Sequence, residues 1–420
     1  MYFSTKEILV LTLYNILTYF VVFNLKILSL FNSKIKKGVK GRQETFSILK
    51  SKIEAKDKTI WFHCASLGEY EQGLPVFEEI RKLFPKYKII LTFFSPSGYE
   101  IRKNAPIADI VTYLPIDTKH NAQTFIDLIN PELVVFVKYE IWPNYLNILN
   151  KRKTKTILIS AMFRKNQLFF KPYGRWMLKL LHSYEHIFVQ NNTSKTLLEE
   201  YGFKNVSVSG DTRFDRVFNQ LKIDNTLDFI EEFKGDKLCF VAGSTWPEGE
   251  YFISKYINTC NTELLKFIIA PHNIKTKQIE KLRNSISKKV VLYSEKEKKN
   301  LNEFDVLIID TIGLLSKIYS YADIAYVGGA LGNTGLHNTL EPAIFGVPII
   351  IGNHFKKFPE AIEMLQNGGL FSVPNQDQFD EILNKLVNQA SFRLMSGQSN
   401  IEYIKKNQGA VIQIINFLRK

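Results

Sequence analysis

The sequence predicts an α/β protein with two parallel-sheet domains, preceded by a membrane-associated helix at the N-terminus. Short apolar runs alternate with helix-length spacers along most of the 420 residues, a pattern typical of parallel strands wrapped by helices. These runs fall into two series, separated by a polar stretch from about 210 to 236. A largely apolar segment from Ile8 to Phe31 stands apart from both series.

The apolar segment contains no acidic residue and only one charged residue, Lys26. Its length is sufficient to span a bilayer. A weakly polar stripe at helical spacing would instead let the helix lie in the membrane interface; it consists of Thr12, Asn15, Tyr19, Lys26 and Ser29. Both alternatives tether the chain, so we assign residues 1–32 as an N-terminal membrane anchor helix.

Basic residues follow the anchor closely, and we interpret residues 33–58 as a basic linker. By the positive-inside rule they keep the rest of the chain on the cytoplasmic side, and they also suit an anionic membrane surface. A solvated linker is the alternative. The net charge of +14 calls for an acidic partner, but the basic residues do not gather around exposed aromatic residues, so no nucleic acid is expected.

The first series of strands predicts an N-terminal Rossmann-like domain over 59–215, and residues 216–236 are expected to form a linker. The second series predicts a C-terminal Rossmann-like domain over 237–420. The expected strands are 59–65, 88–94, 110–114, 133–137, 155–160, 186–189 and 205–208, then 238–242, 265–270, 290–293, 306–310, 324–327 and 347–351. In such sheets ligands bind beyond the carboxyl ends of the strands.

The first expected strand of the N-terminal half ends in a possible catalytic turn. Gly68 permits a tight turn, and Glu69 at the following helix start could accept a proton from a substrate hydroxyl. Ser66 and Glu69 also have the spacing of a capping box, which is the structural alternative. Glu140 follows another apolar strand, so we assign Ser66, Gly68 and Glu140 to an acceptor cleft.

The second half has its own polar residues at strand ends. Ser244 and Thr245 follow its first strand and suit a phosphate. His272 ends the next strand, and residues 310–313 close another with a turn glycine. The chain has no Walker A ending and no clean GxGxxG, which weakens a dehydrogenase interpretation.

Residues 327–348 read as a buried strand, a glycine turn and a helix start. Asn338 and Glu341 lie one helical turn apart and could face one ligand, with Glu341 accepting from ribose hydroxyls. A glycine-rich turn capped by Asn338 is the alternative. The three cysteines form no CxxC, so neither a disulfide framework nor a zinc site is indicated.

Taken in order, these motifs resemble those of the bacterial 3-deoxy-D-manno-octulosonic acid (Kdo) transferases of lipid A biosynthesis. The resemblance covers about residues 58 to 373. It rests on HCASLGE (63–69), KYEIWPN (138–144), GDTRFD (210–215), GSTWPEGE (243–250), APH (270–272), DTIG (310–313) and VGGALGNTGLHNTLEP (327–342).

The resemblance implies a GT-B glycosyltransferase whose two Rossmann-like domains face a cleft. It implies transfer of Kdo from CMP-Kdo to the tetraacylated disaccharide precursor of lipid A (lipid IVA), with inversion, at the cytoplasmic face of the bacterial inner membrane. Glu69 would be the general base. No cofactor and no metal are expected.

The resemblance also implies a set of donor contacts in the second half. These are Pro271, His272, Thr311, Ile312, Gly313, Asn338, Thr339, Leu340 and Glu341, with Ser244 and Thr245 lining the same cleft. Arg213 is also assigned to donor binding, because it stands where the family commonly has lysine and keeps a cation that could face a phosphate or the sugar carboxylate. Pro271 meets His272 directly where the family usually has an intervening arginine, and Leu314 replaces a glutamate.

Two other functions share these features. One is a different GT-B enzyme, such as a transferase or epimerase that uses a uridine nucleotide sugar. The other is a non-catalytic, membrane-tethered protein that binds sugar nucleotides.

Overall fold

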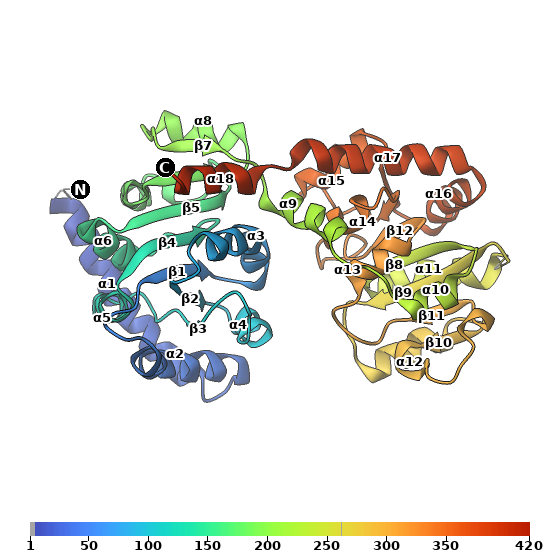
Figure 1. Ribbon diagram of the computed structural model, residues 1–420, viewed down its shortest axis with the longest axis horizontal. Coiled ribbons are helices and arrows are strands. Elements are labelled where there is room, and N and C mark those ends of the chain that lie inside the picture. Colours follow the sequence, from blue (N-terminus) through green and yellow to red (C-terminus); the bar gives the residue numbers. More distant parts are fainter. Residues whose placement is uncertain (1–4, 262) are drawn as a thin grey trace. The chain divides into compact units, whose positions relative to one another are not determined.

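The computed structural model describes residues 5–261 and 263–420, and it divides into two compact α/β units (Figure 1). Unit 1 runs to Arg216 and includes Gly409–Lys420, and unit 2 is Val217–Gln408. The sequence analysis placed 409–420 in the C-terminal domain, whereas the structure groups these residues with unit 1.

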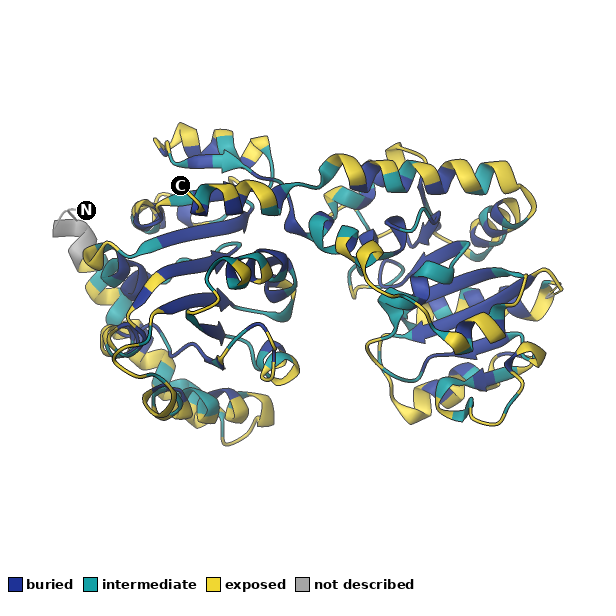
Figure 2. Ribbon diagram, in the orientation of Figure 1, coloured by how far each residue is buried: buried dark blue, intermediate teal, exposed yellow. Residues whose placement is uncertain are grey.

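Unit 1 is built on a parallel sheet with strand order β3-β2-β1-β4-β5-β6-β7. Its strands are buried on both faces (Figure 2), which explains why they read as continuous apolar runs. The strand order reverses between β1 and β4, and this is the point where such sheets bind ligands. The strands are β1 Thr59–Cys64, β2 Lys88–Phe93, β3 Ile110–Tyr113, β4 Pro131–Val137, β5 Lys155–Ala161, β6 His186–Val189 and β7 Val206–Val208.

Helices connect these strands and cover both faces of the sheet (Figure 1). One of them, α18, comes from the far end of the chain and packs against α3. Its Ile414, Ile415 and Leu418 are buried in one core cluster with Phe77 and Phe188. The helices are α3 Leu67–Leu83, α4 Pro96–Arg102, α5 Lys119–Ile129, α6 Pro143–Arg152, α7 Arg175–Leu180, α8 Asn192–Glu200 and α18 Ala410–Leu418.

The predicted basic linker is instead largely a helix, α2 Ser33–Lys52. Asn32 caps it by accepting from two backbone N–H groups. Gly41 lets α2 approach the Tyr113 ring, because a Cβ at Gly41 would lie 2.3 Å from a ring carbon. Thr45 donates to the Tyr113 carbonyl at 3.0 Å, so the helix is fixed against the β3 edge.

The anchor segment forms helix α1, Thr5–Leu28, which lies along unit 1. Tyr14 donates to Asp117 Oδ2 at 2.8 Å, and Asn144 donates to Asn15 Oδ1 at 2.8 Å. Residues Leu9–Leu28 are long and apolar enough to cross a membrane by length and composition. The side of α1 away from the body is apolar and exposed: Leu9, Leu13, Ile16, Phe20, Phe23 and Ile27.

Unit 2 repeats the architecture with strand order β10-β11-β9-β8-β12-β13-β14. The sequence predicted all of these strands except β14. They are β8 Leu238–Thr245, β9 Leu265–Pro271, β10 Val290–Leu292, β11 Val306–Ile308, β12 Ile324–Val327, β13 Ile349–Ile351 and β14 Leu370–Ser372.

The expected linker 216–236 contains helical residues. Helix α9, Thr212–Asn219, passes from unit 1 into unit 2, and α10, Asp228–Lys234, follows it. The other helices of unit 2 are α11 Pro247–Thr259, α12 Thr276–Asn284, α13 Leu315–Ile318, α14 Leu340–Ala343, α15 Pro359–Gln366, α16 Gln376–Asn388 and α17 Ala390–Asn407.

Candidate functional site

In unit 1 the site begins where β1 ends and α3 starts. Ser66 is the N-cap of α3: the Glu69 N–H donates to Ser66 Oγ at 3.4 Å, and the Ser66 N–H donates to Glu69 Oε2 at 2.8 Å. The capping box considered in the sequence analysis is therefore present. Gly68 lies in the first helical turn rather than in a tight turn, and a Cβ there would meet no atom within 4 Å.

The Glu69 carboxyl group is enclosed, with an exposed fraction of 9% for the residue. Burial raises the pKa of Glu69 and the neighbouring Glu140 carboxylate raises it further, whereas His63 and Lys138 oppose that shift. A carboxylate with a raised pKa binds a proton more readily than an exposed one. This is the property required of a carboxylate that acts as a general base near neutral pH.

Glu140 is held beside Glu69 by aromatic and histidine side chains. His63 is fully buried, and its Nε2 lies 3.1 Å from Glu140 Oε2, although the angle does not suit a hydrogen bond. The other ring nitrogen of His63 lies 2.8 Å from Thr92 Oγ1. The Trp142 indole N–H donates to the same Glu140 oxygen. These partners fix the position of the second carboxylate.

His63, Thr92 and Trp142 were not among the predicted site residues. His63 and Trp142 belong to the motifs that carry the family resemblance, and their place in those motifs was the available signal. Thr92 lies within β2, where a buried threonine in an apolar strand gave no signal.

Arg213 lies in unit 1, close to α3. Its Nε donates to Asp211 Oδ2 at 2.8 Å, and Gln72 Nε2 donates to the other Asp211 oxygen at 3.2 Å. Gln72 is three residues beyond Glu69 on α3. The predicted cation is therefore positioned by a buried acid in the unit that contains Glu69.

In unit 2 the predicted residues follow strands that are neighbours in the sheet, β11, β9, β8 and β12. Ser244, the second-last residue of β8, has a φ of +51°, a left-handed conformation that is uncommon outside glycine. A Cβ at Gly328 would lie 2.1 Å from the Ser244 carbonyl oxygen, so only glycine fits there. Thr245 donates to Glu250 Oε1 at 2.8 Å. The Thr245 hydroxyl, which the sequence analysis assigned to the donor cleft, is therefore already bonded within the protein.

Three flat side chains stack beside this edge. Trp246 and His272 are stacked with ring centroids 4.7 Å apart, and His272 and His337 are 4.5 Å apart. Trp246 donates its indole N–H to His337 Nε2 at 3.1 Å. Burial and the adjacent His272 lower the pKa of His337 to about 4, so His337 is neutral at pH 7 and can accept that bond. Trp246 and His337 were missed by sequence reasoning, although both lie within quoted motifs.

Asn338 and Glu341 lie on the same side of the chain, as predicted. Asn338 Nδ2 donates to Glu341 Oε1 at 3.0 Å, and Asn338 Oδ1 accepts from the Leu340 N–H at 3.2 Å. The expected helix start is a single turn, α14. Thr339 and Leu340 are buried, so they offer a ligand at most their backbone groups.

The last predicted segment follows β11. Ile312 is 84% exposed and Gly313 has a φ of +93°, so this loop presents backbone to solvent. Pro271 ends β9, directly before His272. The carboxyl ends of parallel strands meet at one edge of a sheet, and the unit 2 residues gather there.

Comparisons with known proteins show which family the chain is similar to. Residues 40–216 match the family model described as 3-deoxy-D-manno-octulosonic-acid transferase (kdotransferase). The 3-deoxy-D-manno-octulosonic acid transferase of Haemophilus influenzae is 27% identical over 86% of this chain and 86% of its own length. That of Aquifex aeolicus is 27% identical over 78% of this chain and 86% of its own.

Solved structures support the fold. The UDP-GlcNAc 2-epimerase of Neisseria meningitidis, bound to UDP-GlcNAc, matches with a TM-score of 0.61 and 14% identity, covering 87% of this chain and all of that one. At this identity the match shows the shared two-domain GT-B-like fold alone. The sequence matches show that the chain is similar to the 3-deoxy-D-manno-octulosonic acid transferases, which are glycosyltransferases.

Proposed function

We propose that this glycosyltransferase transfers Kdo from CMP-Kdo to the tetraacylated disaccharide precursor of lipid A, with inversion, in lipopolysaccharide biosynthesis. The observation that carries the proposal is the enclosed Glu69 carboxyl group with its raised pKa, next to the switch point of the unit 1 sheet. Its position inside the HCASLGE motif adds the family context.

In the proposed reaction Glu69 removes the proton from the primary hydroxyl of the acceptor as that oxygen attacks the anomeric carbon of Kdo. The new glycosidic bond forms on the face opposite the leaving group, and the bond to CMP breaks with its electron pair on the phosphate. The capping bond to the Ser66 N–H uses Glu69 Oε2. Among the described residues Oε1 has no hydrogen bond, so this oxygen is the one that would accept the proton.

The donor would bind at the strand-end edge of unit 2. Backbone N–H groups beside Ser244 and Gly313 suit the phosphate. His272 offers an N–H donor in place of the arginine that this chain lacks before it. Glu341 would accept from the ribose hydroxyls, with its carboxylate oriented by Asn338.

The acceptor is a lipid, and α1 supplies a membrane contact that suits it. Its body-facing side is tied to Asp117 and Asn144, whereas its opposite side is apolar and exposed. A helix fixed along a protein surface in this way suits the membrane interface better than a bilayer-spanning position. We place the protein at the cytoplasmic face of the bacterial inner membrane, lying on α1.

A transfer assay tests the proposal. Purified full-length protein is incubated with CMP-Kdo and the lipid A precursor in detergent, and the mass of the lipid product is measured by mass spectrometry. A gain of one or more Kdo units supports the proposal and counts the sugars added. No gain with folded protein that accepts a uridine nucleotide sugar would favour the alternative enzyme, and CMP-Kdo binding without turnover would favour the binding protein.

A further inference from the structure

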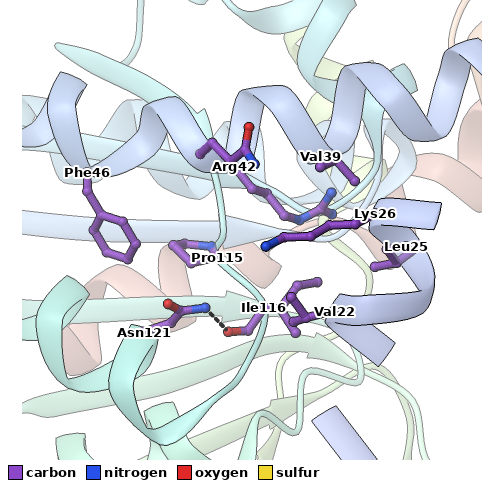
Figure 3. A pocket seen from close by; sticks show the side chains of 10 residues that line it. Val22, Leu25, Lys26, Val39, Arg42, Phe46, Pro115, Ile116 and Asn121 are labelled. Carbon is purple, nitrogen blue, oxygen red and sulfur yellow. Dashed lines mark hydrogen bonds between the residues drawn. The ribbon is translucent and has the colours of Figure 1, made fainter. Parts of the chain in front are cut away.

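A pocket of about 290 Å³ lies between α1 and α2 in unit 1, on the α1–α2 side rather than among the Glu69 site residues (Figure 3). Its walls are mostly apolar side chains from both helices and from the loop after β3. Val22, Leu25, Val39, Phe46, Pro115 and Ile116 form them. The volume is at the lower end of the range for small-ligand sites. It accommodates part of one acyl chain and is too small for a tetraacylated disaccharide.

Two cations line this pocket and no acidic residue does. Figure 3 shows the Lys26 side chain extending across the pocket below Arg42 in this view, with its ammonium on the side of Pro115. In the described part of the chain the Lys26 ammonium makes no hydrogen bond or ion pair. Two like charges in an apolar pocket repel each other unless an anion lies between or beside them.

No carboxylate among the described residues pairs with Arg42, which is held by other contacts. Its guanidinium donates to the carbonyls of Gly38, Phe94 and Leu114. These bonds use three of its five N–H groups, and the guanidinium lies over the Phe94 ring at 4.5 Å. None of these contacts supplies a full negative charge, and burial lowers the pKa of Arg42. The next acid along the loop, Asp117, is bonded to Tyr14 and to the backbone of α6. The pocket therefore favours an anionic ligand.

The pocket opens beside the apolar face of α1, which identifies the source of such a ligand. Val22 and Leu25 lie on the body-facing side of α1 and line the pocket, whereas Phe20, Phe23 and Ile27 on its outer side are exposed. Phospholipids of a bilayer that covers the outer side would be within reach of the pocket mouth. Their acyl chains match the walls and their phosphates match the cations.

We propose that this pocket binds one anionic phospholipid of the membrane, with part of an acyl chain between α1 and α2 and the phosphate against Lys26 and Arg42. The bound lipid would hold α1 to unit 1 and fix its depth in the bilayer. This site is separate from the acceptor site, and it does not depend on the proposed transfer reaction.

Native mass spectrometry of the full-length protein in mild detergent tests the proposal, with phosphatidylglycerol and phosphatidylcholine as probes. We expect one phosphatidylglycerol per protein and at least a 10-fold preference over phosphatidylcholine. Val39→Trp fills the pocket and should abolish retention of the lipid. Ile35→Trp, on the same helix outside the lining, is the matched control and should retain it.

Lys26→Gln tests whether the Lys26 charge contributes to binding of the lipid phosphate. Lys26 is exposed, so this substitution should leave folding intact. It should reduce the preference for phosphatidylglycerol several-fold, and Lys36→Gln on α2 should not. Equal retention by Val39→Trp and the unaltered protein overturns the proposal, as does an unchanged preference in Lys26→Gln. Displacement of phosphatidylglycerol by an equal amount of the lipid A precursor also overturns it, because the pocket would then belong to the acceptor.

Discussion

The two units place their predicted site residues at equivalent edges, the carboxyl ends of parallel strands. The kinds of chemical group at the two edges differ. Unit 1 encloses carboxyl groups: Glu69 and Glu140 are nearly buried and are held by His63 and Trp142. Unit 2 has the stacked rings of Trp246, His272 and His337 at this edge. It also has glycine-containing turns, one of them beside Ile312, which is 84% exposed. Burial and the Glu140 charge raise the pKa of Glu69, which suits proton transfer, whereas backbone N–H groups at strand-end turns suit phosphate binding. This contrast supports the proposal that the chemistry takes place in unit 1 and that the donor binds to unit 2.

Glu69→Gln should have the largest effect. Without the carboxylate no base accepts the proton, so we expect the turnover rate to fall about 10²- to 10⁴-fold. Donor affinity, which depends on unit 2, should not change. Turnover by mass spectrometry and CMP-Kdo binding by calorimetry measure the two separately.

Glu78→Gln is the matched control, because Glu78 lies on the same helix α3 at an exposed position. It should keep full activity. If Glu69→Gln lowers donor affinity as well as turnover, the result contradicts the assignment of donor binding to unit 2 alone.

His272→Ala should have the opposite effect: it should weaken donor binding and leave turnover unchanged. Losing a donor to a charged phosphate costs about 1.5–3 kcal/mol, so the donor dissociation constant should rise about 10-fold to 100-fold while turnover at saturating donor is retained. His182→Ala is the control, because His182 is likewise stacked on a ring, Phe203, but lies in unit 1. Unchanged donor binding in His272→Ala would remove His272 from the donor site.

Glu140→Gln should change a pH profile. The charge of Glu140 raises the pKa of Glu69, and its removal lets that pKa fall. The base form of Glu69 then persists to lower pH, so the acid limb of the kcat/KM profile should move to lower pH, whatever happens to the maximum rate. A limb that stays in place would show that the two carboxylates do not interact, and a limb that moves to higher pH would contradict the expected sign of their interaction.

A pair of glycine substitutions should give the smallest effects, of opposite sign. Both Gly68 and Gly313 have open space where a Cβ would lie. Gly68 is helical, so Gly68→Ala should stabilise the protein by about 0.5–1 kcal/mol. Gly313 has a φ of +93°, so Gly313→Ala should cost about 1–2 kcal/mol. Chemical unfolding measures both, and equal effects would contradict the contrast between a regular and a left-handed backbone.

The sheets could be predicted from the sequence because buried parallel strands leave an apolar run that few other elements mimic. β14 was missed, because Gly368 and Gly369 precede it and Ser372 interrupts its apolar run. Helix α2 was mistaken for a linker because its lysines and glycines hid the apolar positions Val39, Phe46 and Leu49. The return of α18 to unit 1 depends on long-range packing, and no local pattern reports it.

Site prediction had the same limits. Glu69 and Glu140 could be found because each follows a strand within a recognisable motif. His63 lies inside a strand, and its role depends on which residue of a neighbouring strand faces it. The stack of Trp246, His272 and His337 joins three segments of unit 2, and only the fold brings them together.

The origin of α18 has a consequence for how the chain is made. Residues 410–418 leave the ribosome only after the whole of unit 2, Val217–Gln408, has been synthesised. At ~5–20 residues per second that interval is about 10–40 s for these residues. During this time the sheet of unit 1 lacks Ile414, Ile415 and Leu418, so the first domain to be translated is the last to be completed. Its uncovered apolar surface is then a substrate for chaperones, and early termination of translation would leave the Glu69 domain unfinished.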